Sequence, residues 1–288
     1  MTQTAWARAP NPGWLDLQYN NRARVREFAQ IMHAWQEASL LVHDSMSRRL
    51  DVAYGVGPSE RLDVFPAPHA NAPVLVFIHG GYWRALDKSE QSFVAPSFVA
   101  DGAMVVVPNY QLCPQNTVQG IVLQMAHALI WVYRHAALYG GDPARMVVVG
   151  HSAGGQIAAM LLNCVWPAIA ADLPPQLLLG AMSISGIFDM EVMRKTPFLK
   201  DDLGLTSDWA RKLSPVLLPA PTKPLFAMVG DCESEEFLRQ NQSIRRAWGQ
   251  RAVPVCESIA RCNHFTVLSD LADPCGQSHR RVLELMGV

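Results

Sequence analysis

Apolar runs recur along the chain and alternate with stretches in which apolar residues return every three or four positions. Continuous apolar runs are typical of strands covered on both faces, and the spaced pattern is typical of amphipathic helices. The runs predict strands at residues 74–78, 104–107, 146–149, 177–184, 224–229 and 253–258. The spaced patterns predict helices near residues 89–100, 117–138, 152–163, 235–249 and 276–286. Strands that alternate with helices in this way indicate a mostly parallel sheet with helices on both faces.

The first part of the chain follows different patterns. Residues 20–46 carry apolar side chains at helical spacing, which predicts an amphipathic helix outside the sheet, within an N-terminal helical segment of about 15–48. We expect the polar cluster at residues 19–22 to be the cap and the solvated start of this helix. Residues 49–54 and 61–65 alternate polar and apolar around a turn, which predicts an antiparallel hairpin at the sheet edge. The sheet then has roughly eight strands.

One connection, at about residues 187–222, is too long for a simple link between strand and helix. We interpret it as a small cap inserted over the strand ends, with apolar side chains that line a pocket. Those side chains are Phe188, Met190, Met193, Phe198, Leu203 and Trp209. Since the sequence has no internal repeat and no linker, residues 1–288 are predicted to form a single domain.

Composition narrows the function classes. Half of the 288 residues are hydrophobic, which is enough for a large core, and the formal net charge of −1 gives no electrostatic reason to expect nucleic acid or an anionic membrane as partner. No apolar run is long enough to cross a membrane, and residues 1–10 lack the pattern of a secretory signal. The six cysteines include no C-x-x-C pair, so we expect free thiols and a cytoplasmic protein. A homodimer is compatible with the sequence.

The pentapeptide Gly150-His151-Ser152-Ala153-Gly154 stands between a predicted strand and a predicted helix. This is the layout of a nucleophile elbow, in which a serine lies on a sharp turn and small neighbours let strand and helix approach. Glycine-rich turns produce the same motif by chance, and the strand and helix around it are what favour the elbow. Ser152 is therefore the candidate nucleophile.

A serine nucleophile needs a base and an acid that orients the base, and after an elbow the acid precedes the histidine in the chain. His264 follows the last predicted strand, whereas His279 lies in the C-terminal helix beside two arginines, where we expect a solvated side chain. The acid is expected after the strand at 224–229, where Asp231, Glu233 and Glu235 stand. Spacing does not choose between Asp231 and Glu233, and Glu235 has the position of a first-turn helix carboxylate.

The segment His79-Gly80-Gly81-Tyr82-Trp83 directly follows the strand at 74–78. Backbone N–H groups of Gly80 and Gly81, together with that of Ala153, are the candidate oxyanion hole. His79 ends a buried strand, so we interpret it as a structural hydrogen-bonding residue of this loop. The histidines show no H-E-x-x-H or similar cluster, and neither a metal nor a cofactor is expected.

These motifs, with Tyr110-Gln111-Leu112-Cys113-Pro114 and Asn263-His264-Phe265, resemble the hormone-sensitive-lipase-like branch of the α/β-hydrolases. Within it the chain is most similar to the kynurenine formamidase group, through Tyr19-Asn20-Asn21-Arg22 and Glu233-Ser234-Glu235-Glu236-Phe237. The resemblance implies the α/β-hydrolase fold and favours Glu233 as the acid, although the animal enzymes usually have aspartate there.

The resemblance implies a serine hydrolase that attacks an N-formyl arylamine such as N-formylkynurenine. Tyr82 and Trp83 are then expected to stack on the aryl ring, or else to pack the loop against the cap, and Trp166, Phe198 and Trp209 leave the same choice open. A carboxylesterase for short acyl esters shares every motif, because one fold serves many substrates. A non-catalytic binding protein is the alternative of another class. In each case the expected partner is a small molecule.

Overall fold

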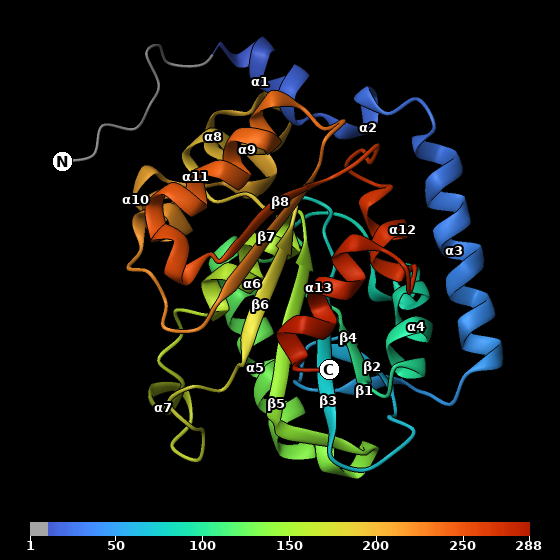
Figure 1. Ribbon diagram of the computed structural model, residues 1–288. Coiled ribbons are helices and arrows are strands. Elements are labelled where there is room, and N and C mark those ends of the chain that lie inside the picture. Colours follow the sequence, from blue (N-terminus) through green and yellow to red (C-terminus); the bar gives the residue numbers. More distant parts are fainter. Residues whose placement is uncertain (1–10) are drawn as a thin grey trace.

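An eight-stranded sheet runs through the centre of the computed structural model, which describes residues 11–288 (Figure 1). The strand order is β1-β2-β4-β3-β5-β6-β7-β8. The strands are β1 Arg49–Ala53, β2 Arg61–Phe65, β3 Ala72–Ile78, β4 Met104–Pro108, β5 Gly141–His151, β6 Gly180–Ile184, β7 Leu225–Gly230 and β8 Val255–Ile259. β2 is antiparallel to both β1 and β4, and all other pairs are parallel. The predicted architecture, including the edge hairpin, is confirmed.

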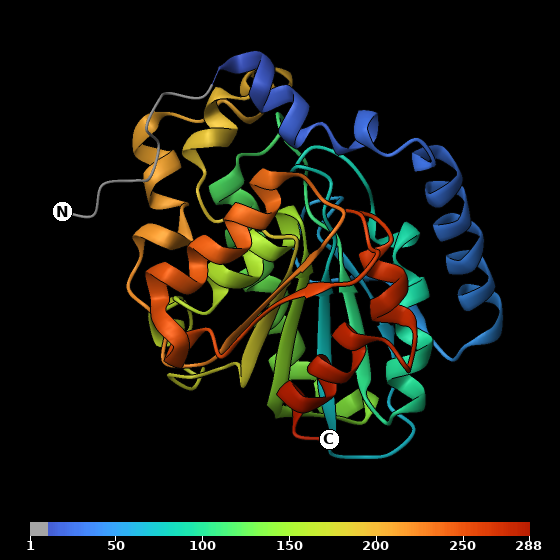
Figure 2. The same cartoon turned by 45° about the horizontal axis from the view of Figure 1, so that its top comes forward.

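Helices cover both faces of this sheet (Figures 1 and 2). The α-helices are α1 Pro12–Tyr19, α2 Asn21–Arg24, α3 Phe28–Ser45, α4 Ala95–Ala100, α5 Val118–His135, α6 Ala153–Leu161, α7 Trp166–Ile169, α8 Glu191–Lys195, α9 Pro197–Leu203, α10 Ser207–Lys212, α11 Glu235–Ala252, α12 Val267–Ala272 and α13 Gln277–Met286. Short 3-10 turns are η1 Lys88–Glu90, η2 Ser92–Val94, η3 Ala136–Tyr139 and η4 Pro215–Leu217. The expected helix at 89–100 is thus η1, η2 and α4 in succession.

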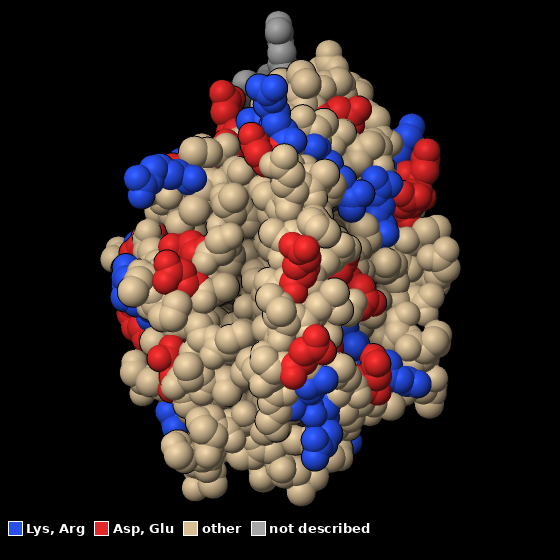
Figure 3. Space-filling view, turned by 90° about the vertical axis from the view of Figure 1, so that its right-hand side faces the viewer, with Lys and Arg blue, Asp and Glu red and all other residues tan. Residues whose placement is uncertain are grey.

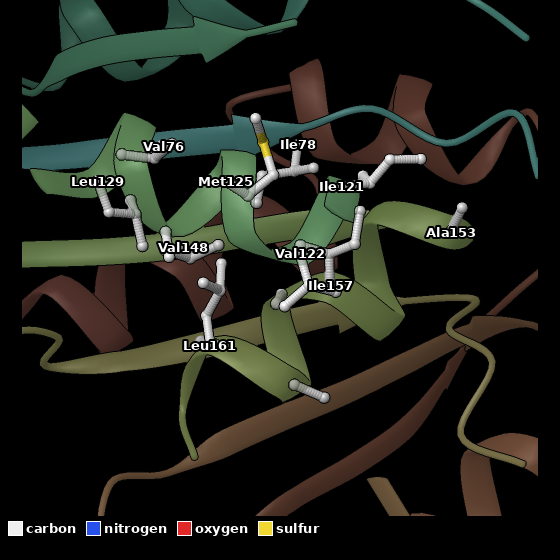
Figure 4. Close-up of a cluster of buried hydrophobic side chains, with 14 of the residues drawn as sticks. Val76, Ile78, Ile121, Val122, Met125, Leu129, Val148, Ala153, Ile157 and Leu161 are labelled. Atoms are coloured by element: carbon white, nitrogen blue, oxygen red, sulfur yellow. The ribbon is translucent and has the colours of Figure 1, made fainter. Parts of the chain in front are cut away.

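The side chains of alternate residues in the central strands pack into two separate hydrophobic cores, one on each face of the sheet. In β3, Val74, Val76 and Ile78 join the cluster that includes α5 and α6, while Leu75 and Phe77 join the cluster that includes α3, α4, α12 and α13. Figure 4 shows α5 and α6 packing their apolar side chains beside Val76 and Val148. Because consecutive strand residues point to opposite faces, a continuous apolar run satisfies both cores. Burial of each large side chain stabilises the fold by roughly 1.5–3 kcal/mol.

The N-terminal segment differs from the expected continuous helix. Asn20 caps the single turn of α2, Val25 is extended, and α3 starts only at Phe28, whose ring lies 5.0 Å from that of Phe265. The chain thus turns at 25–27, so that α1 and α2 pass over the carboxyl ends of the strands and α3 runs down the side (Figures 1 and 2). The expected solvated start is wrong, since Tyr19 is fully buried and Asn21 is 4% exposed.

Between β6 and β7, residues 191–217 form α8, α9, α10 and η4. Phe188, Met190 and Met193 are fully buried in the core cluster that also holds side chains of α5 and α6. Trp209 is 39% exposed and Lys212 lies over its ring, so it packs at the surface. Most apolar side chains of this insertion therefore serve the core.

Several expectations concern the surface and the ends of the chain. All six cysteines are free thiols, as predicted. Between residues 11 and 288, no helix has the length and apolar character that crossing a membrane requires. On the face that carries α3, acidic and basic side chains are interspersed among uncharged ones (Figure 3). Residues 1–10, where no secretory signal is expected, lie outside the described residues.

Candidate active site

Ser152 lies at the sharp turn between β5 and α6, with φ 56° and ψ −114°. A side chain held in such a backbone conformation costs about 1–3 kcal/mol, which the packing around it must offset. That packing is tight, because a Cβ added at Gly154 would come within 2.1 Å of the carbonyl oxygen of Ile78. The elbow that the sequence predicts is therefore present, and it holds Ser152 at the carboxyl end of the sheet.

The side chains of Ser152, His264 and Glu233 form a continuous hydrogen-bonded chain. His264 Nε2 lies 3.0 Å from Ser152 Oγ, and His264 Nδ1 lies 2.6 Å from Glu233 Oε2. All three residues are at most 8% exposed. This is the geometry in which a histidine takes the serine proton while the carboxylate fixes its tautomer.

Glu233 is the acid that reaches His264. Its second oxygen, Oε1, accepts hydrogen bonds from Gly230 N–H at 2.8 Å and from Ser185 Oγ–H at 2.5 Å. Asp231 and Glu235 are exposed and make no hydrogen bond to His264 within the described chain. Ser234 caps α11 by accepting from Phe237 N–H, and this helix start holds Glu233 in place.

His279, in contrast, has a structural place and not the solvated one that was expected. Its side chain is fully buried, with Nε2 2.7 Å from Asp101 Oδ2 and its ring 4.2 Å from the ring of Phe98. The two arginines that follow it point elsewhere because His279 lies on the inner face of α13, beside Val282. It has no contact with Ser152.

The candidate oxyanion loop lies beside the nucleophile because of strand register. Ile78 of β3 pairs with Gly150 of β5, so Gly80 and Ser152, each two residues later, become neighbours. A Cβ added at Gly80 would lie 3.0 Å from Ser152 Cβ. The N–H groups of Gly81 and Ala153 have no protein acceptor among residues 11–288. For Ala153 the reason is that it is the first residue of α6, where the N–H has no partner within the helix. Unpaired N–H groups beside a serine can stabilise an oxyanion.

Two buried histidines hold the loops around Ser152. His79 Nδ1 lies 2.9 Å from Gly80 O and its Nε2 lies 3.1 Å from Asn109 Oδ1, so the ring donates to one of these two oxygens, which confirms the structural role predicted for it. His151 Nε2 donates to the backbone carbonyl of His264 at 2.8 Å. Burial lowers the pKa of His79 and lowers the pKa of His151 well below its ordinary value, so both rings are neutral near pH 7.

A cavity of about 30 Å³ opens at Ser152 and His264. It is lined by the N-terminal segment and by the loops, through Asn21, Arg22, Phe28, Met32, Trp35, Gly81, Tyr82, Leu86, His151, Ser152, His264 and Phe265. The insertion at 187–222 does not line it, which differs from the expectation. The insertion contacts the site through Phe198, whose ring meets that of Tyr82 edge-on at 5.6 Å.

Of the aromatic residues expected at the substrate, only Tyr82 lines this cavity. Trp83 is fully buried in the core, and its Nε1–H donates to Gln156 Oε1 at 3.3 Å. Consecutive left-handed φ values, 52° at Tyr82 and 57° at Trp83, turn the two rings apart. Trp166 is 2% exposed and belongs to the same core cluster. For Trp83 and Trp166, the packing alternative therefore holds.

A second, more polar cavity of about 220 Å³ lies on the other side of His264. Arg24, Arg26, Glu27, Glu233 and Asn263 contribute to its walls. In the part of the chain that is described, no three His, Cys, Asp or Glu side chains are grouped in a way that could hold a metal ion. Sequence reasoning missed the N-terminal wall of both cavities, for which the polar cluster at 19–22 was the available signal.

Comparisons with known proteins agree with this geometry. A family model described as BD-FAE matches residues 62–164. Kynurenine formamidase of Danio rerio is 28% identical over 247 residues, 83% of this chain and 82% of the fish protein. Esterase LipQ of Mycobacterium tuberculosis is 34% identical over 152 residues, 49% of this chain and 35% of its own. The crystal structure of a candidate thioesterase from Silicibacter sp. superimposes with a TM-score of 0.82 at 26% identity, covering 95% of this chain and 99% of that one.

Proposed function

We propose that this chain, a serine hydrolase of the α/β-hydrolase fold, cleaves the bond between the formyl carbon and the nitrogen of an aryl formamide, of which N-formylkynurenine is an example. Ser152 is the nucleophile, His264 the general base and acid, and Glu233 the orienting carboxylate. Gly80, Gly81 and Ala153 supply the N–H groups of the oxyanion hole.

In the first half of the reaction, His264 Nε2 takes the Ser152 proton as Oγ attacks the formyl carbon. The carbonyl oxygen becomes an oxyanion beside the N–H groups of Gly81 and Ala153. Glu233 Oε2, 2.6 Å from Nδ1, stabilises the imidazolium that forms. The intermediate then collapses, the C–N bond breaks, and His264 gives its proton to the leaving arylamine.

In the second half, water attacks the formyl ester on Ser152. His264 takes a proton from the water, the C–O bond to Oγ breaks, and the proton returns to Ser152. Formic acid leaves and ionises to formate in solution, and the starting state is restored.

The observation that carries the proposal is the size of the cavity at Ser152. The cavity there measures about 30 Å³, and its lining includes Phe28, Met32 and Trp35. A formyl group adds only a hydrogen to the carbonyl and needs the least room of any acyl group, whereas a longer acyl chain needs more space beside Phe28, Met32 and Trp35. The similarity to kynurenine formamidase of Danio rerio over 83% of the chain supports the same choice.

A carboxylesterase for short acyl esters is the second candidate, favoured by the similarity to esterase LipQ over about half of the chain. Its chemistry uses the same residues and differs only in the atom that leaves. The free state of all six cysteines fits a reducing compartment, and on that ground we also propose a cytoplasmic location.

The test compares kcat/KM for N-formylkynurenine with that for p-nitrophenyl esters of increasing acyl length. We expect turnover of the formamide and an ester rate that falls from acetate to hexanoate. Brisk ester hydrolysis with negligible formamide turnover would replace the formamidase by the esterase. A protein that folds but reacts neither with substrates nor with a fluorophosphonate probe would be a binding protein. Ser152→Ala is the control, since it removes only the attacking oxygen.

A further inference from the structure

The loop that carries the candidate oxyanion N–H of Gly81 is tied to the N-terminal segment at one side chain. The hydroxyl of Tyr82 donates to the backbone carbonyl of Tyr19 and accepts from Asn21 Nδ2 at 3.3 Å. Gly81 has φ of 96°, which glycine adopts freely, but Tyr82 next to it has φ of 52°, a left-handed conformation that a side chain keeps only with support from external contacts. This hydroxyl is such a contact, and it is adjacent in sequence to Gly81.

At the other end of this tie, the side chain of Tyr19 is buried against α11, the helix that follows the candidate acid. Tyr19 Oη–H donates to Glu236 Oε2 at 2.8 Å, and Gln240 Nε2 donates to Tyr19 Oη at 3.0 Å. Arg239 Nε donates to Glu236 Oε1 at 2.8 Å, so this carboxylate is held on both sides. Burial raises the pKa of Tyr19 and of Tyr82 well above the ordinary tyrosine value, so both hydroxyls keep the protons that they donate.

Residues 19–21, called here the strap, therefore bridge two parts of the site that are more than 150 residues apart in sequence. On one side is the loop with Gly81, and on the other is α11, which begins two residues after Glu233. The strap is fixed between them, with Tyr19 fully buried and Asn21 4% exposed.

We infer that Tyr82 is a positioning residue, whose hydroxyl, held by the strap, sets the Gly81 N–H against the oxyanion. The inference rests on the proposed serine hydrolysis but not on the formamide, because esters and formamides pass through the same kind of tetrahedral intermediate. The Tyr82 ring lines the cavity as well. Ring and hydroxyl can be separated, since Tyr82→Phe keeps the ring and its packing against Phe198 and removes only the tie.

For Tyr82→Phe we expect kcat to fall about 10- to 100-fold, less than the roughly 100- to 1000-fold lost with an oxyanion donor itself. KM should stay within about twofold, because the contact acts on the transition state and not on bound substrate. The fall should be similar for N-formylkynurenine and p-nitrophenyl acetate. If wild-type protein hydrolyses only the ester, the formamide proposal fails while the ratio of variant to wild type still tests the tie.

Tyr19→Phe breaks the far end of the tie and should also lower kcat. Because both changes act through one chain of contacts, the double variant should lose little more than the worse single variant. Tyr139→Phe is the matched control, since that half-buried tyrosine lies in η3, before β5 and at the opposite end of the sheet from Ser152. If Tyr82→Phe fails to fold, Asn21→Ala tests the same junction. A kcat within twofold of wild type, an effect confined to KM, or additive losses in the double variant would each overturn the inference.

Discussion

Replacing Glu233 by glutamine is the sharpest test of the candidate triad, because it changes one oxygen of a carboxylate whose three hydrogen-bonding partners are known. Oε1 accepts from Gly230 N–H at 2.8 Å and from Ser185 Oγ–H at 2.5 Å, and Oε2 faces His264 Nδ1 at 2.6 Å. The amide of glutamine has one accepting oxygen, and two donors at Oε1 hold it there. The amide NH₂ then faces Nδ1, which can accept its hydrogen bond only without a proton.

That change inverts the histidine tautomer. The proton moves to Nε2, and Nε2 is the atom 3.0 Å from Ser152 Oγ that must accept the serine proton. A wrong tautomer of this kind lowers kcat by about 10⁴-fold when the triad aspartate of a serine protease is replaced by asparagine. This corresponds to about 5 kcal/mol of transition-state stabilisation. We expect a fall of that order for Glu233→Gln, with KM nearly unchanged.

The assay is steady-state hydrolysis of p-nitrophenyl acetate and of N-formylkynurenine, with far-ultraviolet circular dichroism to establish that the variant is folded. Asp231→Asn is the matched control, because it removes an exposed carboxylate from the same loop. It should retain wild-type kcat within a few fold. A Glu233→Gln enzyme within tenfold of wild type, or an Asp231→Asn enzyme that loses more, would refute the assignment.

Three further predictions concern the fold around the site. Gly154→Ala should destabilise the protein by roughly 1–3 kcal/mol or more and abolish turnover, because the new Cβ meets the Ile78 carbonyl oxygen at 2.1 Å. The control is Gly13→Ala, whose new Cβ has no contact closer than 3.5 Å. In thermal melts and activity assays this control should show neither effect. The lowered pKa of His151 means that the unfolded chain binds more protons below about pH 6.5, so stability should fall as pH drops through that value. Denaturant titrations at pH 7.5 and 5.5 should show a smaller difference for His151→Gln, and an equal difference would contradict this cause. With Ellman's reagent, the exposed Cys275 should react fast, and the exposed Cys232 should react more slowly because its hydrogen bond to Asp231 raises the pKa of its thiol. Cys113, whose pKa burial raises to about 11, should react only after unfolding, and early modification of Cys113 would contradict the packing.

The parts of the molecule that follow from local backbone rules were predictable from sequence. The strand at 74–78 is a continuous apolar run, and β3 spans Ala72–Ile78 with every residue buried. The elbow was predictable because small residues at fixed offsets from Ser152 have one steric purpose. The register between neighbouring strands was not predictable. The pairing of Ile78 with Gly150 is what brings Gly80 to Ser152.

Local sequence rules did not predict which of Asp231 and Glu233 contacts His264. Both stand on one loop, and the turn in which Glu233 N–H donates to Gly230 O at 3.2 Å decides which carboxylate points to His264. His279 was misjudged because two neighbouring arginines suggested a solvated face, whereas the helix buries this one position against Phe98 and Asp101. Neighbours in sequence do not share a helix face.

The largest omission, the N-terminal wall of the site, has a physical origin. Tyr19 and Glu236 are 217 residues apart, and a hydrogen bond over that separation leaves no periodicity in either segment. The residues that make the contact are polar, so hydrophobic patterning assigns them to the surface, yet each finds a partner once buried. A polar residue that has no local capping role is therefore a signal of long-range burial. By that criterion Asn21, which follows the Asn20 cap and donates to Tyr82, belongs to the candidate active site together with the loop that it contacts.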